Sequence, residues 1–410
     1  MMKIILYSIF TLFMASCSSW LNNDIFLIIT ISSIVGIYFL KGCDFNKEVF
    51  YVLIAWSFIN IFSYFINGAD TFSIASFGAV TMRMLMPYFI MKIIGNDFFD
   101  GLQNYLFILC VISFPFFIIE SINPEYVQSL APSLNFMTMD EQKTKGGFYI
   151  FFYMHSGWAQ HYDWTVRNCG FMWEPGAFSM ILSFMIVYQL YRDDFKLTFK
   201  TIFLIICMLS TYSTSGFMAL FSIIILYFFY NKSFYKKFSY LIPLIIIPVI
   251  IIGYNFYKSS EFMEQKIERY IEQSDNTSKW KFKDSRMIRV NRVGFAIIAA
   301  ESSLVNPIGN GITDSSYIVK KYKNAQGPNS YATILIQWGW LGVIVLIYCL
   351  YNFRIKGKKG RFLLLLPVSL CLFSNPFSFK YLIYAIIFAV LCQLCDNQEP
   401  IEQNKEEILI

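Results

Sequence analysis

Hydrophobic residues gather in long runs separated by short polar connections, which is the pattern of a polytopic helical membrane protein. About twelve apolar runs follow one another, at residues 4–20, 24–40, 48–66, 76–94, 102–120, 176–191, 199–210, 215–230, 238–254, 331–352, 361–374 and 378–395. Some are shorter than the ~20 residues of a straight crossing. The two runs flanking residues 211–216 could therefore form two helices or one broken, re-entrant element. The pattern predicts an all-α, polytopic integral membrane protein with about 12 transmembrane helices.

Composition agrees with this prediction. Of 410 residues, 56% are hydrophobic and 15% are charged, whereas a soluble domain carries about 25% charged residues. Mean hydropathy is +0.51. These values exclude a soluble enzyme, a nucleic-acid-binding protein and a disordered scaffold. They predict that the chain is embedded in a lipid bilayer.

Lys and Arg concentrate in four short connections, at residues 41–47, 192–200, 232–237 and 354–361. Short basic loops stay in the cytoplasm. The alternate connections at 22–24, 67–73, 211–216 and 374–377 carry neither residue type. This arrangement predicts that both termini are cytoplasmic and that the two long segments, 121–175 and 255–330, are external.

The predicted organisation has six parts. Helices 1–5 occupy residues 1–120 and helices 6–9 occupy 176–254, with the first external loop at 121–175 between them. The second external loop covers 255–330, helices 10–12 cover 331–395, and a cytoplasmic tail covers 396–410. Long loops in compact proteins are usually functional or disordered, and the aromatic content of these two favours folded, functional segments.

The first loop ends in a candidate catalytic group. Pro175 suits the first position of a helix, which makes Glu174 the predicted N-cap. Arg167 precedes Glu174 by seven positions. Glu174 could be only a helix cap, or it could accept a proton from a sugar hydroxyl; both interpretations stay open.

The second loop contains a predicted amphipathic helix with an arginine face. Arg286, Arg289 and Arg292 recur at three-residue steps, so they share one side of a helix that begins at Asp284 or Ser285 and ends before Pro307. Three partners fit this face: lipid headgroups, upstream acids of the same loop, or a diphosphate bound by bidentate hydrogen bonds.

Metal and nucleotide motifs are not apparent. Cys392 and Cys395 form a lone pair with no second pair or nearby His, and no phosphate-binding glycine loop occurs. We expect neither a metal nor a cofactor.

Four short motifs together suggest a family. They are Arg167-x-x-Gly170-Phe171-x-x-Glu174-Pro175 at the start of a helix, the Ser/Thr-Gly turn at 213–216, Asn306-Pro307-x-Gly309-x-Gly311, and Asn329-Ser330 before a glycine-containing span. With the two large external loops, the chain resembles the Wzy-type O-antigen or capsular repeat-unit polymerases, which share a superfamily with the O-antigen ligases. The resemblance covers the layout of the whole chain but only short motifs in detail, and it implies a GT-C-like fold.

The resemblance implies a metal-independent, inverting glycosyltransferase in the bacterial inner membrane. Its substrate would be an undecaprenyl-diphosphate-linked oligosaccharide, polymerised on the periplasmic face, and a polysaccharide chain-length regulator is a possible partner. Arg167, Arg289 and Arg292, with Arg286 in reserve, would offset charge on the departing diphosphate. Glu174 would be the base.

Two alternatives stay open. An O-antigen ligase typically has a His before the Asn at the end of the second loop, where this chain has Pro328 before Asn329. A flippase would place charges within the spans, where Arg83 is one of few. Asn329, His161 and Arg83 are further candidates for substrate contact.

Overall fold

The computed structural model describes residues 1–15, 24–67, 74–126, 129, 147–148, 152–153, 166–231, 292–312, 329–355, 357–374 and 381–394. The helices are α1 (Met2–Ala15), α2 (Asp24–Leu40), α3 (Lys47–Asn67), α4 (Ile74–Ile94), α5 (Phe98–Ile122), α8 (Pro175–Arg192), α9 (Phe199–Ser210), α10 (Thr214–Tyr230), α14 (Arg292–Val305), α16 (Ser330–Asn352), α17 (Arg361–Ser374) and α18 (Tyr381–Leu391). Two small hairpins pair β1 (Gly147–Phe148) with β2 (Phe152–Tyr153), and β3 (Arg354–Ile355) with β4 (Lys358–Lys359).

Four of the described helices are long and apolar enough to cross a membrane: Lys47–Ile66, Ile74–Ile94, Phe98–Ile122 and Ser330–Asn352. Shorter apolar helices accompany them, among them α9, α10, α17 and α18. The fold is therefore compatible with a helical membrane protein, as predicted. The run expected at 238–254 lies outside the described residues, and the count of about twelve spans stays a prediction.

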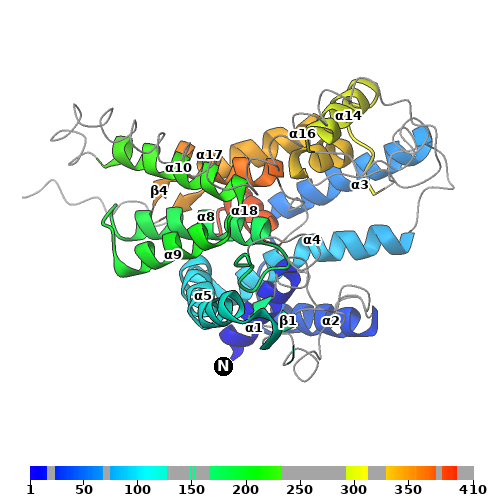
Figure 1. Ribbon diagram of the computed structural model, residues 1–410. Helices are drawn as coiled ribbons and strands as arrows, with labels where there is room; N and C mark the ends of the chain where they lie inside the picture. The colour runs from blue at the N-terminus through cyan, green and yellow to red at the C-terminus, as the bar shows by residue number, and fades with distance from the viewer. Residues whose placement is uncertain are drawn as a thin grey trace, which may run out of the picture.

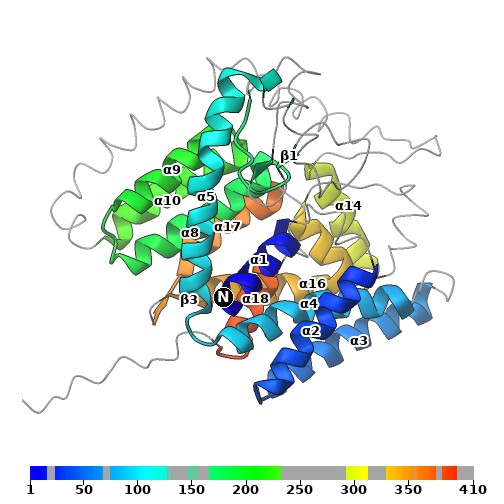
Figure 2. The ribbon, with the colours of Figure 1, turned by 90° about the horizontal axis from the view of Figure 1, so that it is seen from below.

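The helices form two packed groups (Figures 1 and 2). One contains α8, α9, α10 and α17, with α5 against α9. The other contains α2, α3, α4, α14 and α16, while α1 and α18 lie near the centre. Contacts between α16 and α17 join the two groups. Helix α8 is buried along almost its whole length, and this places the motif that precedes it at the end of a well-packed element.

Three of the four predicted basic connections, at 41–47, 192–200 and 354–361, meet at one end of the bundle, while the fourth, at 232–237, lies outside the described residues. The connection at 354–361 folds as the β3–β4 hairpin, where Lys358 pairs with Asp194 at 2.7 Å and the Tyr191 hydroxyl lies 3.1 Å from the Lys359 carbonyl oxygen. At the same end, ion pairs join Lys3 to Asp97 (3.7 Å) and Arg192 to Asp100 (3.6 Å), and Lys41 Nζ donates to the Ile93 carbonyl (3.0 Å). These connections, which the distribution of Lys and Arg assigned to one side of the membrane, therefore lie together in the structure.

Helices α9 and α10 are two separate elements. The Tyr227 hydroxyl near the end of α10 donates to the carbonyl of Phe195, which precedes α9, at 3.0 Å. Helix α10 therefore returns alongside α9 after a turn at residues 211–213. Of the two interpretations of this region, the structure supports a hairpin of short helices.

Helix α16 is broken at Gly339, whose φ of 62° and ψ of −161° are not helical. The loop after α14 satisfies the backbone groups that the break releases. Trp340 N donates to Pro307 O (3.1 Å), Asn310 N to Ile336 O (2.8 Å) and Gly311 N to Gln337 O (2.9 Å). The backbone of the Asn306-Pro307-x-Gly309-x-Gly311 motif therefore packs against α16 at its break and hydrogen-bonds to it.

Helix α3 holds the other side of this loop. Ser63 Oγ donates to the Asn310 carbonyl, and the Ile312 backbone N–H donates to Asn60 Oδ1, each at 2.8 Å. The rings of Trp56 and Trp338 stack beside it with centroids 4.4 Å apart. Since a break in a membrane helix needs replacement hydrogen bonds, α3, the loop and α16 must assemble together.

Candidate functional site

Arg167 lies at the end of the bundle opposite the basic connections. Its side chain is 8% exposed, and its Nε donates to the carbonyl of Thr211 at 3.1 Å. Thr211 is the C-cap of α9, so the guanidinium lies at the negative end of that helix dipole. This contact brings together two motifs that are far apart in the sequence.

Asn168 fixes the same segment a second time. Its backbone N–H donates to the Ser210 carbonyl (3.0 Å), its Nδ2 donates to Ser210 Oγ (2.8 Å), and its Oδ1 accepts from Gly170 N (2.8 Å). Gly170 has φ of +53°, and the ring of Phe178 occupies the space that a Cβ would need. The chain therefore turns tightly at Gly170 and enters α8, which explains the spacing of the motif.

Glu174 occupies the predicted N-cap position of α8, with Pro175 in the first turn. Its carboxylate makes no capping hydrogen bond to the helix. The residue is half-buried at the positive end of the helix. The positive end of a helix dipole favours a negatively charged group at this position.

Beneath Arg167, hydroxyl and thiol groups meet between α8, α10 and α17. Ser213 caps α10, accepting from Gly216 N (3.4 Å), and its Oγ lies 3.4 Å from Ser179 Oγ and 3.0 Å from Ser215 Oγ. Cys371 lies 3.5 Å from Ser183 Oγ. Gly216 permits this approach, because a Cβ there would lie 2.8 Å from Ser179 Cβ.

Sequence reasoning singled out the turn at 213–216 but missed the residues of α8 and α17 that meet it. The available signal was the Ser179–Ser183 spacing of four residues, which places two hydroxyls on one face of an otherwise apolar helix. Glu120 was also missed. It is completely buried in the last turn of α5, and a carboxylate in an apolar span is a default candidate for function.

Asn329 and Arg292 form a second group. Asn329 caps α16, its Oδ1 accepting from Ala332 N (3.1 Å), and its Nδ2 donates to the Arg292 carbonyl (3.1 Å). Asn329 is 0% exposed, so contact with a substrate would require this junction to open. Arg292 is half-buried at the first residue of α14.

Helix α17 lies between the two groups. Its Cys371 contacts the serine cluster, while its Ser369 hydrogen-bonds to the Tyr331 hydroxyl, two residues after Asn329. Arg167 is thus tied to the end of α9, and the Arg292 carbonyl to the start of α16.

Helix α14 ends at Val305, which confirms the predicted end before Pro307. Three other predicted site residues, Arg286, Arg289 and His161, lie outside the described residues.

Arg83 lies elsewhere. It is exposed in the middle of α4 and within electrostatic range of the Tyr381 hydroxyl on α18. Among the described residues, no group of three or more His, Cys, Asp or Glu could hold a metal ion.

Comparison of the chain with protein-family models, curated proteins and solved structures found no match in any of the three. The functional argument therefore depends on the motifs and on their geometry.

Proposed function

We propose that the chain is a membrane glycosyltransferase that polymerises undecaprenyl-diphosphate-linked oligosaccharide repeat units, as Wzy-type polymerases do. One observation carries the proposal: Arg167 binds the turn that begins α10, while α8 begins just after Glu174 at the same place. The N-termini of α8 and α10 supply backbone N–H groups at this end of the bundle, and the Arg167 guanidinium adds a positive charge beside the carbonyl end of α9. These are the groups that bind a diphosphate.

The proposed reaction is a single displacement. The hydroxyl of the terminal sugar on the fresh repeat unit attacks the anomeric carbon of the growing chain. The new C–O bond forms as the bond from that carbon to the lipid diphosphate breaks, with inversion. Glu174 takes the hydroxyl proton, and Arg167, with Arg292 and the arginines at 286 and 289, stabilises the departing diphosphate.

The proposal includes an orientation in the bacterial inner membrane. The end that carries Arg167 and Glu174 faces the periplasm, and the end that carries the β3–β4 hairpin faces the cytoplasm. In this orientation both termini are cytoplasmic. Its support is that the basic short connections among the described residues gather at one end and that Lys and Arg in such loops stay inside. About twelve spans and two periplasmic loops complete this topology.

The test uses purified protein in liposomes with a lipid-linked repeat unit as the sole substrate. We expect a ladder of polymer on the lipid diphosphate. Arg167→Ala should lower the rate by about 100-fold or more, and Glu174→Gln by a similar factor. Arg192→Ala is the matched control, since Arg192 lies at the opposite end of α8; it should retain the rate.

Other outcomes would separate the alternatives. Transfer of preformed polymer to a lipid A core without elongation would identify a ligase. Movement of the lipid-linked unit across the bilayer without new glycosidic bonds would identify a flippase. Full polymerisation by both Arg167→Ala and Glu174→Gln would show that these residues are not the catalytic site, although the chain would still be a polymerase.

A further inference from the structure

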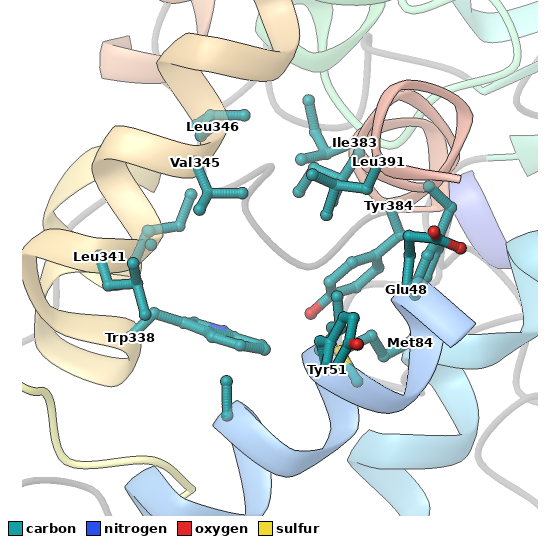
Figure 3. A pocket seen from close by; sticks show the side chains of 16 residues that line it. Glu48, Tyr51, Met84, Trp338, Leu341, Val345, Leu346, Ile383, Tyr384 and Leu391 are labelled. Carbon is teal, nitrogen blue, oxygen red and sulfur yellow. The ribbon is translucent and has the colours of Figure 1, made fainter. Parts of the chain in front are cut away.

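An apolar cavity of about 290 Å³ lies between α3, α4, α16 and α18 (Figure 3). Its walls are mainly aliphatic and aromatic, including Val52, Ala55, Ile334, Val345, Ile383 and Ile387. The side chains of Trp338 and Tyr384 face each other across it. Two lining residues, Tyr51 and Leu341, are 65% and 52% exposed, so the cavity opens at the lipid-facing surface of the bundle.

A second, polar cavity of about 700 Å³ adjoins it at the basic end of the bundle. Glu48 and Leu391 line both cavities, so the two spaces are adjacent. The polar cavity is formed by residues 41–44 and 46, by the end of α4 and by the turn after α18. One space is apolar and its neighbour is polar, the same division that an amphiphile has.

The charged groups of the polar cavity are balanced. Lys41 and Lys92 supply two positive charges, and Asp44 and Glu48 supply two negative charges. Lys41 is also held in place by the Ile93 carbonyl. A headgroup with only negative charge would meet the two acids, whereas one with both a phosphate and an ammonium group finds a partner for each.

We propose that this composite cavity binds a glycerophospholipid with a zwitterionic headgroup of the phosphatidylethanolamine type. One acyl chain fills the apolar cavity beside Trp338 and Tyr384. The phosphate binds Lys92 and Lys41, and the ammonium group binds Glu48. The site lies at the basic end of the bundle, away from Arg167, so it is a structural lipid site separate from the proposed reaction centre.

Three features favour a phospholipid over other occupants. The apolar cavity is close to the lower end of the ~300–1,000 Å³ typical of ligand pockets, which suits one chain. Its opening faces the bilayer, where phospholipid is the most concentrated amphiphile. Lysines at a membrane boundary lie at the level of phosphate headgroups.

The experiment is native mass spectrometry of the full chain exchanged from detergent into phosphatidylethanolamine or phosphatidylglycerol. We expect one phosphatidylethanolamine to stay bound at energies that remove phosphatidylglycerol. Lys92→Gln should weaken that binding by about fivefold. Glu48→Gln should abolish the preference between the two lipids, because it removes the partner of the ammonium group.

Val345→Phe tests the acyl chain, since the added volume enters the apolar cavity. Ile344→Phe is its matched control: Ile344 is the adjacent residue and is 60% exposed. Lys47→Gln, at an exposed position outside the lining, is the control for Lys92→Gln. We expect both site variants to lose lipid and both controls to keep it.

Three results would overturn the proposal. Equal retention of both lipids by the unaltered chain would remove the headgroup assignment. Equal losses in Val345→Phe and Ile344→Phe would show that the cavity is not the site. Displacement of phosphatidylethanolamine by an equal amount of undecaprenyl phosphate would assign the cavity to the polyprenyl carrier. Polymer formation is not a readout, so the proposed function and this site can fail separately.

Discussion

The backbone N–H of Trp340 donates to the carbonyl of Pro307 at 3.1 Å, across the break in α16. Without the break, that N–H would bond to a carbonyl within its own helix. The loop after α14 thus replaces part of the backbone ladder of a helix that is long and apolar enough to span a membrane. In an apolar environment unsatisfied backbone groups cost several kcal/mol each, so the loop is required for the break.

Gly339→Ala should destabilise the protein. Gly339 has φ of +62°, and an added Cβ would overlap the backbone of Pro307 and Ile308. We expect the free energy of unfolding to fall by about 2–4 kcal/mol, from strained backbone and lost hydrogen bonds. The change is measured as a lower unfolding temperature in detergent, with size-exclusion chromatography used to monitor the loss of folded protein.

Gly36→Ala is the control for that measurement. Gly36 lies in α2, where an added Cβ would have nothing within 4 Å and the backbone has no positive φ. Alanine there should leave the unfolding temperature equal or slightly higher, since it favours the helix. If Gly339→Ala behaved like Gly36→Ala, the break would not depend on the glycine.

The sequence predicted the helices better than it predicted the contacts. The runs at 24–40, 199–210 and 361–374 coincide with α2, α9 and α17, because apolar runs and the polar connections that end them are set by local composition. The pairing of Arg167 with Thr211 could not be predicted, because it depends on how α8 packs on α9. The same is true of Asn310, whose partner Ile336 belongs to another helix.

Asn329→Ala should lower stability by about 1 kcal/mol or more, because it removes a helix cap and the tie to Arg292. Asn329→Ser keeps a capping oxygen and should recover part of that loss. The measurement is thermal unfolding of both variants beside their polymerase rates. A serine variant with normal stability and a rate reduced by about 100-fold would instead indicate that Asn329 contacts substrate.

The Cys392 thiol should be unreactive near neutral pH. Burial, together with the negative charge of Glu48, raises its pKa to about 12, although Lys92 acts in the opposite direction. Because a raised pKa favours the neutral thiol, and the thiolate is the nucleophile, maleimide should modify Cys392 slowly from about pH 7 to pH 9. Mass spectrometry of tryptic peptides measures the rate.

Cys43 is the internal comparison for this experiment. It lies in the same cavity but is half-buried, and we expect it to react faster. Denaturant should make the two thiols equally reactive. Rapid modification of Cys392 in the folded protein would contradict the burial of this turn and would also weaken the lipid site that it lines.

The orientation of the bundle can be tested with single cysteines in a background without the nine native ones. Glu125 is exposed just after α5, and Lys196 is exposed in the turn between α8 and α9, at the opposite end. With the basic connections in the cytoplasm, a membrane-impermeant maleimide on cells with a permeabilised outer membrane should label Glu125→Cys. It should label Lys196→Cys only after the inner membrane is opened. The reverse pattern would place Arg167 and Glu174 in the cytoplasm, where a periplasmic polymerase could not use them.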